Sequence, residues 1–393
     1  MRIFSGIQPT GQKHLGNYIG AIRQYVEGQD RGDPAIYCIV DLHALTVPWD
    51  PASLRESVYD TTAILLAAGL DPERSILFRQ SDVREHTELT WYLAALTAHG
   101  DLNRMTQFKE KSAKQRELAS AGLFFYPVLQ AADVLAYKAQ EVPVGEDQRQ
   151  HVELMREIAR RFNERFGETL VVPELVIPEV GARIMDLQEP TRKMSTTGGT
   201  PQGTIGLLDT ADVVRKKFRS AVTDSGRDVQ RGDDKPGVSN LIDILSVASG
   251  RTPAEIEAQY GDGGYGQFKQ DVGEAVVELL TPVQERYAEL RADEAELLRL
   301  LALGADKARA ASTPTLARMY EAKDVAQSRW VASNTGQRSG SRTLLLNACT
   351  LESEIWVSEG ARKPWAQVPR SATCGTGSHL TPTLGVVALP KSL

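Results

Sequence analysis

Short apolar runs alternate with longer segments of helical periodicity through the first hundred residues. The runs cover residues 3–7, 35–40 and 75–78, and the second is apolar throughout, as in a strand buried on both faces of a parallel sheet. Apolar residues recur at helical spacing between them, from residue 15, from residue 51 and over 85–99. Strands alternating with helices of this length predict βαβ units, an α/β fold with a Rossmann-like parallel sheet.

Residues 1–20, MRIFSGIQPTGQKHLGNYIG, predict a strand, a glycine-rich turn and the first turn of a helix. A helix N-terminus favours an anion because its backbone N–H groups are free and the macrodipole is positive there. His14 is placed to touch such an anion, and Gly16 leaves room for a ligand near the backbone. An ordinary βα turn with a surface histidine fits the same residues.

Polar residues interrupt the apolar pattern at two further places. Asp41-Leu42-His43 follows the second strand, at the sheet edge where open α/β sheets bind ligands. Gln130 and Asp133 share one face of a predicted apolar helix, next to Tyr126. A carboxylate in such apolar sequence is costly unless it is paired or bound. A functional Asp133 is therefore favoured over a structural acceptor of N–H groups.

Three later segments contain polar or charged residues, and each segment allows two interpretations. The lysines of the segment 105–114 (Lys109, Lys111 and Lys114) indicate a solvated helix face or a ligand site. Gly145 and Asp147 suit a ribose, although an acidic helix N-terminus fits equally. The stretch 190–201 has glycines, small hydroxyl residues and Lys193, as in a mobile phosphate-gripping loop or a plain surface loop.

The second half of the chain is predicted to be helical, with helices over 241–249, 253–260, 268–287 and 292–303. A last helix is expected to begin at Pro314 with Thr313 as its N-cap. The basic cluster 215–219 faces either nucleic acid or solvent. From residue 326 acids become sparse and periodicity is lost, which predicts a disordered tail, or an aberrant one from a shifted reading frame or a late fusion.

Composition narrows the class of protein. The chain has 393 residues, a net charge of −6 and 24% charged residues, as in globular proteins. Its three cysteines form no CxxC pair, so neither a metal site nor a disulfide framework is expected. We see no signal peptide or membrane-spanning run, and we expect a cytoplasmic protein. The negative charge argues against non-specific nucleic-acid binding, but it leaves room for a local basic face.

Six motifs then occur in a familiar order: SGIQPTG with HLGN, CIVDLHALT, MTQFKEKSA, YPVLQAADVL, VPVGEDQRQH and KMST. Over residues 3–320 the chain resembles the bacterial tryptophanyl-tRNA synthetases, which are class I aminoacyl-tRNA synthetases. The resemblance implies a catalytic domain over 1–205, with a HIGH-like motif at 14–17 and a KMSKS-like motif at 193–197. It implies an α-helical anticodon-binding domain over 206–325, before the tail 326–393.

The implied activity has two steps. Tryptophan and ATP give tryptophanyl-adenylate and pyrophosphate, and the tryptophanyl group then passes to tRNA(Trp). The resemblance further implies Mg²⁺ that arrives with ATP, no tightly bound cofactor, and a homodimer.

The resemblance also assigns residues. Those near the reacting phosphates are His14, Asn17, Lys193 and Lys111, with Lys109 beside it. Those implied to bind ATP are Gln8, Gly16, Asn17, Gly145, Asp147, Gln148, Ile184, Lys193, Met194 and Ser195. Those implied to bind tryptophan are Phe4, Gly6, His43, Tyr126, Asp133, Val142, Val144 and Gln148. Asp133 is expected to accept a hydrogen bond from the indole N–H. Such a site discriminates strongly without an editing domain.

Two positions depart from the family pattern. Thr196 stands where the KMSKS-like motif commonly has its second lysine. The loss of this cation suggests a weaker hold on pyrophosphate. It also suggests a duplicate copy of the enzyme with a regulatory or resistance role. Gln130 stands where many relatives have methionine, and the pair Gln130 and Asp133 resembles tyrosyl-tRNA synthetases. A tyrosine-specific ligase is therefore the nearest enzymatic alternative.

Overall fold

The structure is a computed structural model that describes residues 2–31, 35–109, 120–176, 183–196 and 199–335, with the backbone alone over 324–335. Residues 1–338 form one compact unit, and 339–393 form a second one that lies outside the described residues. The predicted boundaries at 205 and 325 stay predictions. Residues 326–335 of the predicted tail belong to a helix, and the rest of that tail lies outside the described residues.

A parallel sheet lies at the centre of the first half of the chain. Strands β1 (Phe4–Ile7), β2 (Ala35–Ile39) and β3 (Ser75–Arg79) pair in that order, all parallel. Strands β4 (Glu141–Pro143) and β5 (Glu174–Val176) form a second parallel pair. A parallel bridge between Ile3 and Glu141 connects the three-stranded sheet to this two-stranded one. The predicted Rossmann-like α/β architecture is confirmed.

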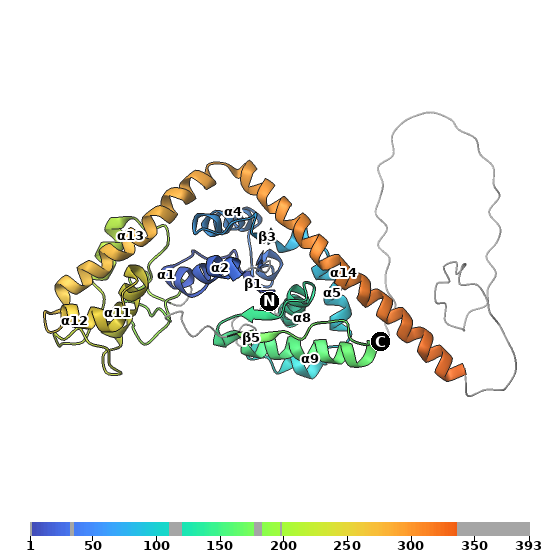
Figure 1. Cartoon of the computed structure of the whole chain (residues 1–393). Coiled ribbons are helices and arrows are strands. Elements are labelled where there is room, and N and C mark those ends of the chain that lie inside the picture. The colour runs from blue at the N-terminus through green and yellow to red at the C-terminus, as the bar shows by residue number, and fades with distance from the viewer. Residues whose placement is uncertain (1, 32–34, 110–119, 177–182, 197–198, 336–393) are drawn as a thin grey trace, which may run out of the picture. The chain divides into compact units, whose positions relative to one another are not determined.

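Helices follow the strands in the predicted alternation (Figure 1). In the first half they are α1 (Leu15–Asn17), the π-type turn η1 (Tyr18–Ile22), α2 (Arg23–Gly28), η2 (Gln29–Arg31), α3 (Asp41–Ala44), α4 (Pro51–Ala67), η3 (Gln80–Asp82), α5 (Glu85–Ala94), α6 (His99–Asn103), α8 (Ala121–Leu135), η4 (Glu146–Gln148) and α9 (Arg149–Phe166). In the second half they are α10 (Ala211–Arg219), α11 (Pro236–Ser249), α12 (Pro253–Tyr260), α13 (Tyr265–Arg291) and α14 (Glu294–Thr335).

The continuous apolar pattern of β2 has a simple cause. All its residues are buried, and they alternate between two apolar cores on opposite faces of the sheet. Tyr37 and Ile39 enter the core that contains α11 and α13, whereas Ile36 and Cys38 enter the core that contains α8 and α9. Both faces of the sheet are therefore covered, as in other parallel sheets.

Two predictions about helices are wrong. Pro314 does not begin a helix, because α14 runs without a break from Glu294 to Thr335. Thr313 is not an N-cap: its hydroxyl donates to the Arg309 carbonyl at 2.8 Å, one turn earlier in the same helix. The predicted helix over 85–99 is divided into α5 and α6. Single-residue signals such as a proline mark a helix start only when tertiary packing does not override them.

The helical second half is attached to the sheet region by ion pairs. At the end of α13, Tyr287 donates to Asp60 of α4 at 2.8 Å, and Arg291 contacts the same carboxylate at 2.7 Å.

Part of the basic cluster 215–219 forms ion pairs within the fold. Lys217 pairs with Asp209 at 2.8 Å, and Arg215 pairs with Glu274 at 2.8 Å.

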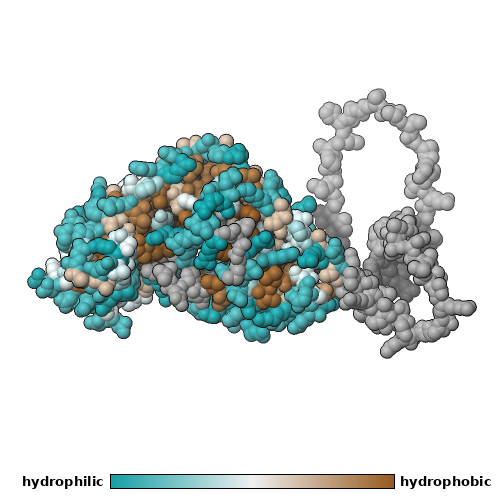
Figure 2. All heavy atoms as spheres, viewed as in Figure 1, coloured by the Kyte–Doolittle hydropathy of each residue, from teal (hydrophilic) through white to brown (hydrophobic). Residues whose placement is uncertain are grey.

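Hydrophilic residues cover much of the described surface seen in Figure 2, with apolar residues between them. Over the described residues, every helix is too short or too polar to cross a membrane. Within the same ranges, no three His, Cys, Asp or Glu side chains are grouped to hold a metal ion.

Candidate active site

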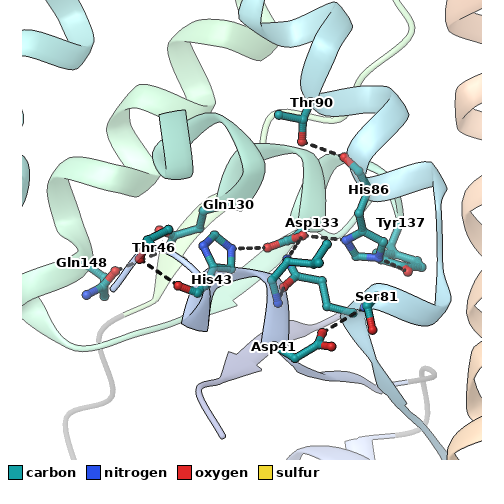
Figure 3. A network of polar contacts seen from close by, with 12 residues as sticks. Asp41, His43, Thr46, Ser81, His86, Thr90, Gln130, Asp133, Tyr137 and Gln148 are labelled. Atoms are coloured by element: carbon teal, nitrogen blue, oxygen red, sulfur yellow. Dashed lines mark hydrogen bonds and ion pairs between the residues drawn. The ribbon is translucent and has the colours of Figure 1, made fainter. Parts of the chain in front are cut away.

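Asp133 of α8 is the centre of a buried hydrogen-bond network (Figure 3). Its side chain is 1% exposed and contacts three donors. His43 Nε2 lies 2.8 Å from Oδ2, while Gln80 Nε2 lies 2.7 Å and His86 Nδ1 2.5 Å from Oδ1. The cost of burying a carboxylate is thus offset by paired donors.

The donors come from adjacent strand ends. His43 lies on α3 directly after β2, and Gln80 lies on η3 directly after β3. The predicted sheet-edge site is therefore where Asp133 meets its partners. Sequence reasoning missed Gln80, His86 and Tyr137. The rule that selected His43 at the end of β2 would have selected Gln80 at the end of β3.

The network keeps Asp133 ionised. Burial by itself raises the pKa of its carboxyl, but hydrogen bonds from His43 and His86 outweigh burial and hold this pKa below the usual range. Since an ionised carboxylate only accepts, His86 Nδ1 is a donor. In the neutral ring, His86 Nε2 then accepts from the Tyr137 hydroxyl at 2.7 Å. These proton positions are assigned from the network.

Among the described residues, one acceptor position of Asp133 remains without a donor. A carboxylate offers about four lone-pair positions, and three are taken by His43, Gln80 and His86. Two of the donors are on Oδ1 and one is on Oδ2, so the remaining position is on Oδ2, the oxygen that His43 contacts. This oxygen can accept one more N–H or O–H donor.

Predicted residues also meet beside this carboxylate. The edge of the Tyr126 ring approaches His43, with 6.2 Å between ring centroids. The Tyr126 hydroxyl lies 2.8 Å from His151 Nε2, and burial raises the pKa of this phenol to about 12. Gln130 donates to Gln148 at 3.3 Å, and Gln148 donates to Asp147 at 2.7 Å.

The predicted apolar wall is tightly packed. Phe4 stacks on Tyr137 with ring centroids 5.5 Å apart, and both belong to the core that contains Asp133's helix. Val142 is buried in the same core and Val144 packs against it. A side chain added at Gly6 would lie 3.0 Å from Val40 Cγ1. The wall is close to the network, but the contribution of each member to a ring pocket stays a prediction.

The glycine-rich turn and the KMST segment lie together on the other side of the site. The His14 backbone N–H donates to Asn17 Oδ1 at 3.1 Å at the start of α1. A Cβ on Gly16 would lie 3.1 Å from the His14 ring and 3.6 Å from Ile184, so glycine keeps this turn close to the next segment. Met194 donates to the Ile184 carbonyl at 3.0 Å, which brings the exposed Lys193 into the same region.

His14 is neutral at physiological pH. Burial lowers its pKa most, and the charges of Lys193 and Lys13 lower it further, to about 4. Its Nδ1 is buried and has no hydrogen-bond partner within the described residues. The described turn thus presents a neutral imidazole beside two lysine charges.

Lys13 is a further residue that sequence reasoning missed. Its ammonium group donates to the carbonyls of Gln8 and Pro9 at 2.9 and 3.0 Å, and to those of Thr10 and Gly11 at 3.5 and 3.2 Å. Burial lowers its pKa to about 8, against a smaller opposing effect of Asp60. Lys13 therefore stabilises the glycine-rich turn from its buried side. No pattern of residue types along the sequence indicates this role.

Asp186 has the matching role under the KMST segment. Its carboxylate accepts from the backbone N–H groups of Gln188 at 2.8 Å and of Thr200 at 3.0 Å. A side chain at Gly203 would overlap this carboxylate. Hydrogen bonds from the surrounding N–H groups outweigh burial and lower the Asp186 pKa.

Other predicted residues lie outside the described ranges or at least partly at the surface. Lys111, Lys114 and Thr197 lie outside the described residues. Gln8, Gly145 and Asp147 are exposed, and Ser195 is half-buried. A cavity of about 380 Å³ opens behind the glycine-rich turn, between Lys13, Asp60 and Asp209, and none of the predicted binding residues lines it.

Comparisons with known proteins agree on one family. The family described as tRNA synthetases class I (W and Y) matches residues 1–281. The tryptophan–tRNA ligase 2 of Streptomyces avermitilis is 52% identical over 81% of this chain and 96% of that protein. The tryptophan–tRNA ligase of Wolinella succinogenes is 48% identical over 81% of this chain and 97% of that protein.

Solved structures give the same result. The tryptophanyl-tRNA synthetase of Mycoplasma pneumoniae matches with a TM-score of 0.75 and 36% identity, over 82% of this chain and 97% of that one. The Campylobacter jejuni enzyme, complexed with ADP and tryptophan, matches with a TM-score of 0.71 and 36% identity, over 82% and 99%.

Proposed function

This chain belongs to the class I tRNA synthetases for tryptophan and tyrosine, and we propose that it is the tryptophan-specific ligase of that family. It activates L-tryptophan with ATP to tryptophanyl-adenylate and pyrophosphate, and then transfers the tryptophanyl group to tRNA(Trp). The curated relatives that match most of its length are tryptophan–tRNA ligases.

The observation that carries this proposal is the remaining acceptor of Asp133. Buried apolar residues surround the carboxylate, and three fixed donors leave Oδ2 one lone pair. An indole offers one N–H on a large apolar ring, so it satisfies that acceptor without adding an unpaired polar group. A ligand without the N–H leaves a buried anion incompletely solvated, which selects strongly against it.

The tyrosine-specific alternative loses its main support in the geometry. It rested on Gln130 acting with Asp133 from one helix face. Gln130 instead donates to Gln148 at 3.3 Å, whereas Asp133 takes its donors from His43, Gln80 and His86.

The glycine-rich turn and the KMST segment suit the nucleotide. Adenylate formation needs donors and cations where negative charge grows on the phosphates, and little covalent help. We assign the neutral His14 and Asn17 to hydrogen bonding and the exposed Lys193 to the charge on pyrophosphate. Lys111, the second predicted cation, is assigned by resemblance alone. Mg²⁺ enters as the MgATP substrate.

Further assignments follow from the family. We propose that the helical second half binds tRNA, that the enzyme works as a homodimer, and that it acts in the cytoplasm. Thr196 in place of a second signature lysine is treated as a variant that keeps activity. A regulatory or resistance copy without ligase activity is the alternative that the following assay tests.

ATP–pyrophosphate exchange with tryptophan and tyrosine in parallel reactions tests the proposal. We expect exchange that depends on tryptophan, and tRNA(Trp) charging in a second assay. Exchange with tyrosine alone would transfer the assignment to the tyrosine enzymes. Absence of exchange with either amino acid would leave a non-catalytic copy.

A further inference from the structure

Helix α14 is packed directly on the strand that leads into the Asp133 network. It lies along β3 and α5, and is the long orange helix of Figure 1. Any side chain at Gly304 would overlap the Leu77 carbonyl of β3, so the two backbones touch there. Ala305 and Ala308 are buried in the core shared with α8. Small residues thus allow this close approach.

Polar side chains of α14 then bond the segment that follows β3. Arg309 donates to the Asp82 carbonyl at 2.6 Å. Thr313 donates to Glu85 Oε1 at 2.8 Å. Glu85 is 4% exposed, and its other carboxylate oxygen has no partner among the described residues. The Thr313 hydroxyl shares its one proton between Glu85 Oε1 and the Arg309 carbonyl, each at 2.8 Å, and so links α14 to this buried side chain.

The contacts of α14 therefore reach residues 77–86 at three positions, Leu77, Asp82 and Glu85. This segment carries Gln80 and His86, the two donors that fix Oδ1 of Asp133.

We propose that α14 is a positioning element for tryptophan selection, in which Arg309 and Thr313 hold residues 77–86 so that Gln80 and His86 fix the Asp133 carboxylate. The inference rests on the proposed function. With Oδ1 fixed by two donors, the remaining lone pair of Oδ2 has one direction. If the two donors shift, the carboxylate turns, and the indole N–H meets it at a poor angle. Selection for the N–H then weakens, although apolar contacts with the ring persist.

The helix offers a matched pair of substitutions. Thr313→Val removes the hydroxyl that contacts Glu85. Thr315→Val makes the same change two residues later, at a buried hydroxyl with no partner within the described residues. Arg309→Met removes the donor to the Asp82 carbonyl without touching Glu85, and it keeps the test valid if Thr313→Val folds poorly.

The measurement compares tryptophan with an analogue whose indole N–H is replaced by sulfur, 3-(benzothiophen-3-yl)alanine, in ATP–pyrophosphate exchange. We expect wild type to prefer tryptophan strongly. Thr313→Val, and separately Arg309→Met, should reduce that preference about tenfold, the effect expected for the loss of one hydrogen bond, through a higher KM for tryptophan at unchanged KM for ATP. Thr315→Val should retain the preference. A merely destabilised enzyme would lose both activities in proportion, so the ratio would not change.

The outcomes separate the two proposals. If Asp133→Asn abolishes the preference while Thr313→Val and Arg309→Met both retain it, the role of α14 is wrong and the indole assignment stands. If wild type has no preference for tryptophan over the analogue, the indole assignment fails and the role of α14 fails with it.

Discussion

The two halves of the site differ in how their polar groups are satisfied. Around Asp133, each oxygen of a fully buried carboxylate has donors within 2.8 Å. Around His14, the imidazole has a buried nitrogen without a partner in the described residues, and Lys193 is exposed. The proposed function gives the halves different tasks: an amino acid is chosen by a pocket that is rigid beforehand, whereas phosphate charge is stabilised by groups that face outward.

The largest effect is expected from a substitution in the preorganised half of the site, around Asp133. Asp133→Asn removes the anion that three donors surround, and the lost buried pairing is worth about 3–5 kcal/mol. We expect kcat/KM for tryptophan to fall about a thousandfold, with the KM for ATP nearly unchanged. Equal losses for both substrates in the exchange assay would contradict the division of the site into two halves.

A smaller effect is expected on the nucleotide half. Lys193→Ala removes a charge that acts on the developing pyrophosphate, and the rate of adenylate formation should fall about a hundredfold. The KM for tryptophan should stay within twofold of wild type. Lys216→Ala, at another exposed lysine, serves as the control in single-turnover measurements. Unchanged turnover in Lys193→Ala would refute the assignment.

Gly16→Ala tests how closely the turn must pack. The added Cβ would lie 3.1 Å from the His14 ring, so the imidazole must shift by a few tenths of an ångström. We expect about a tenfold lower kcat, since small displacements of catalytic groups are costly. Gly20→Ala adds the same methyl group where no atom lies within 4 Å, and it should be neutral. Similar rates for both variants would show that the turn tolerates a side chain.

The smallest effect concerns stability and pH. His14 has a pKa of about 4 in the folded chain against an ordinary 6.5. Between these two pH values His14 is protonated in the unfolded chain and neutral in the folded one. The free energy of unfolding therefore increases as pH rises from 4 to 6.5, and His14 adds no further pH dependence above 6.5. The free energy of unfolding should therefore depend less on pH in His14→Gln than in wild type. Urea unfolding across this range, with the exposed His99→Gln as control, measures the difference.

The sequence was most informative where chemistry and position coincide. It placed Asp133 on an apolar helix and His43 after a buried strand, and both predictions agree with the structure. It missed Gln80, His86 and Tyr137, because a glutamine after a strand and a histidine on a helix are common. It misplaced a helix start at Pro314, since the packing of α14 on β3 overrides the local signal.

What the sequence determined by itself is the set of strands and helices, the order of the motifs and the family. These depend on periodicity and residue type, which are local properties. Only the tertiary structure decided that Asp133 keeps one free acceptor, that Lys13 holds the glycine-rich turn, and that α14 contacts the segment carrying Gln80 and His86. Each of these depends on contacts between residues far apart in the chain, and hydrogen bonds that satisfy a buried group become visible only when the fold brings their partners together.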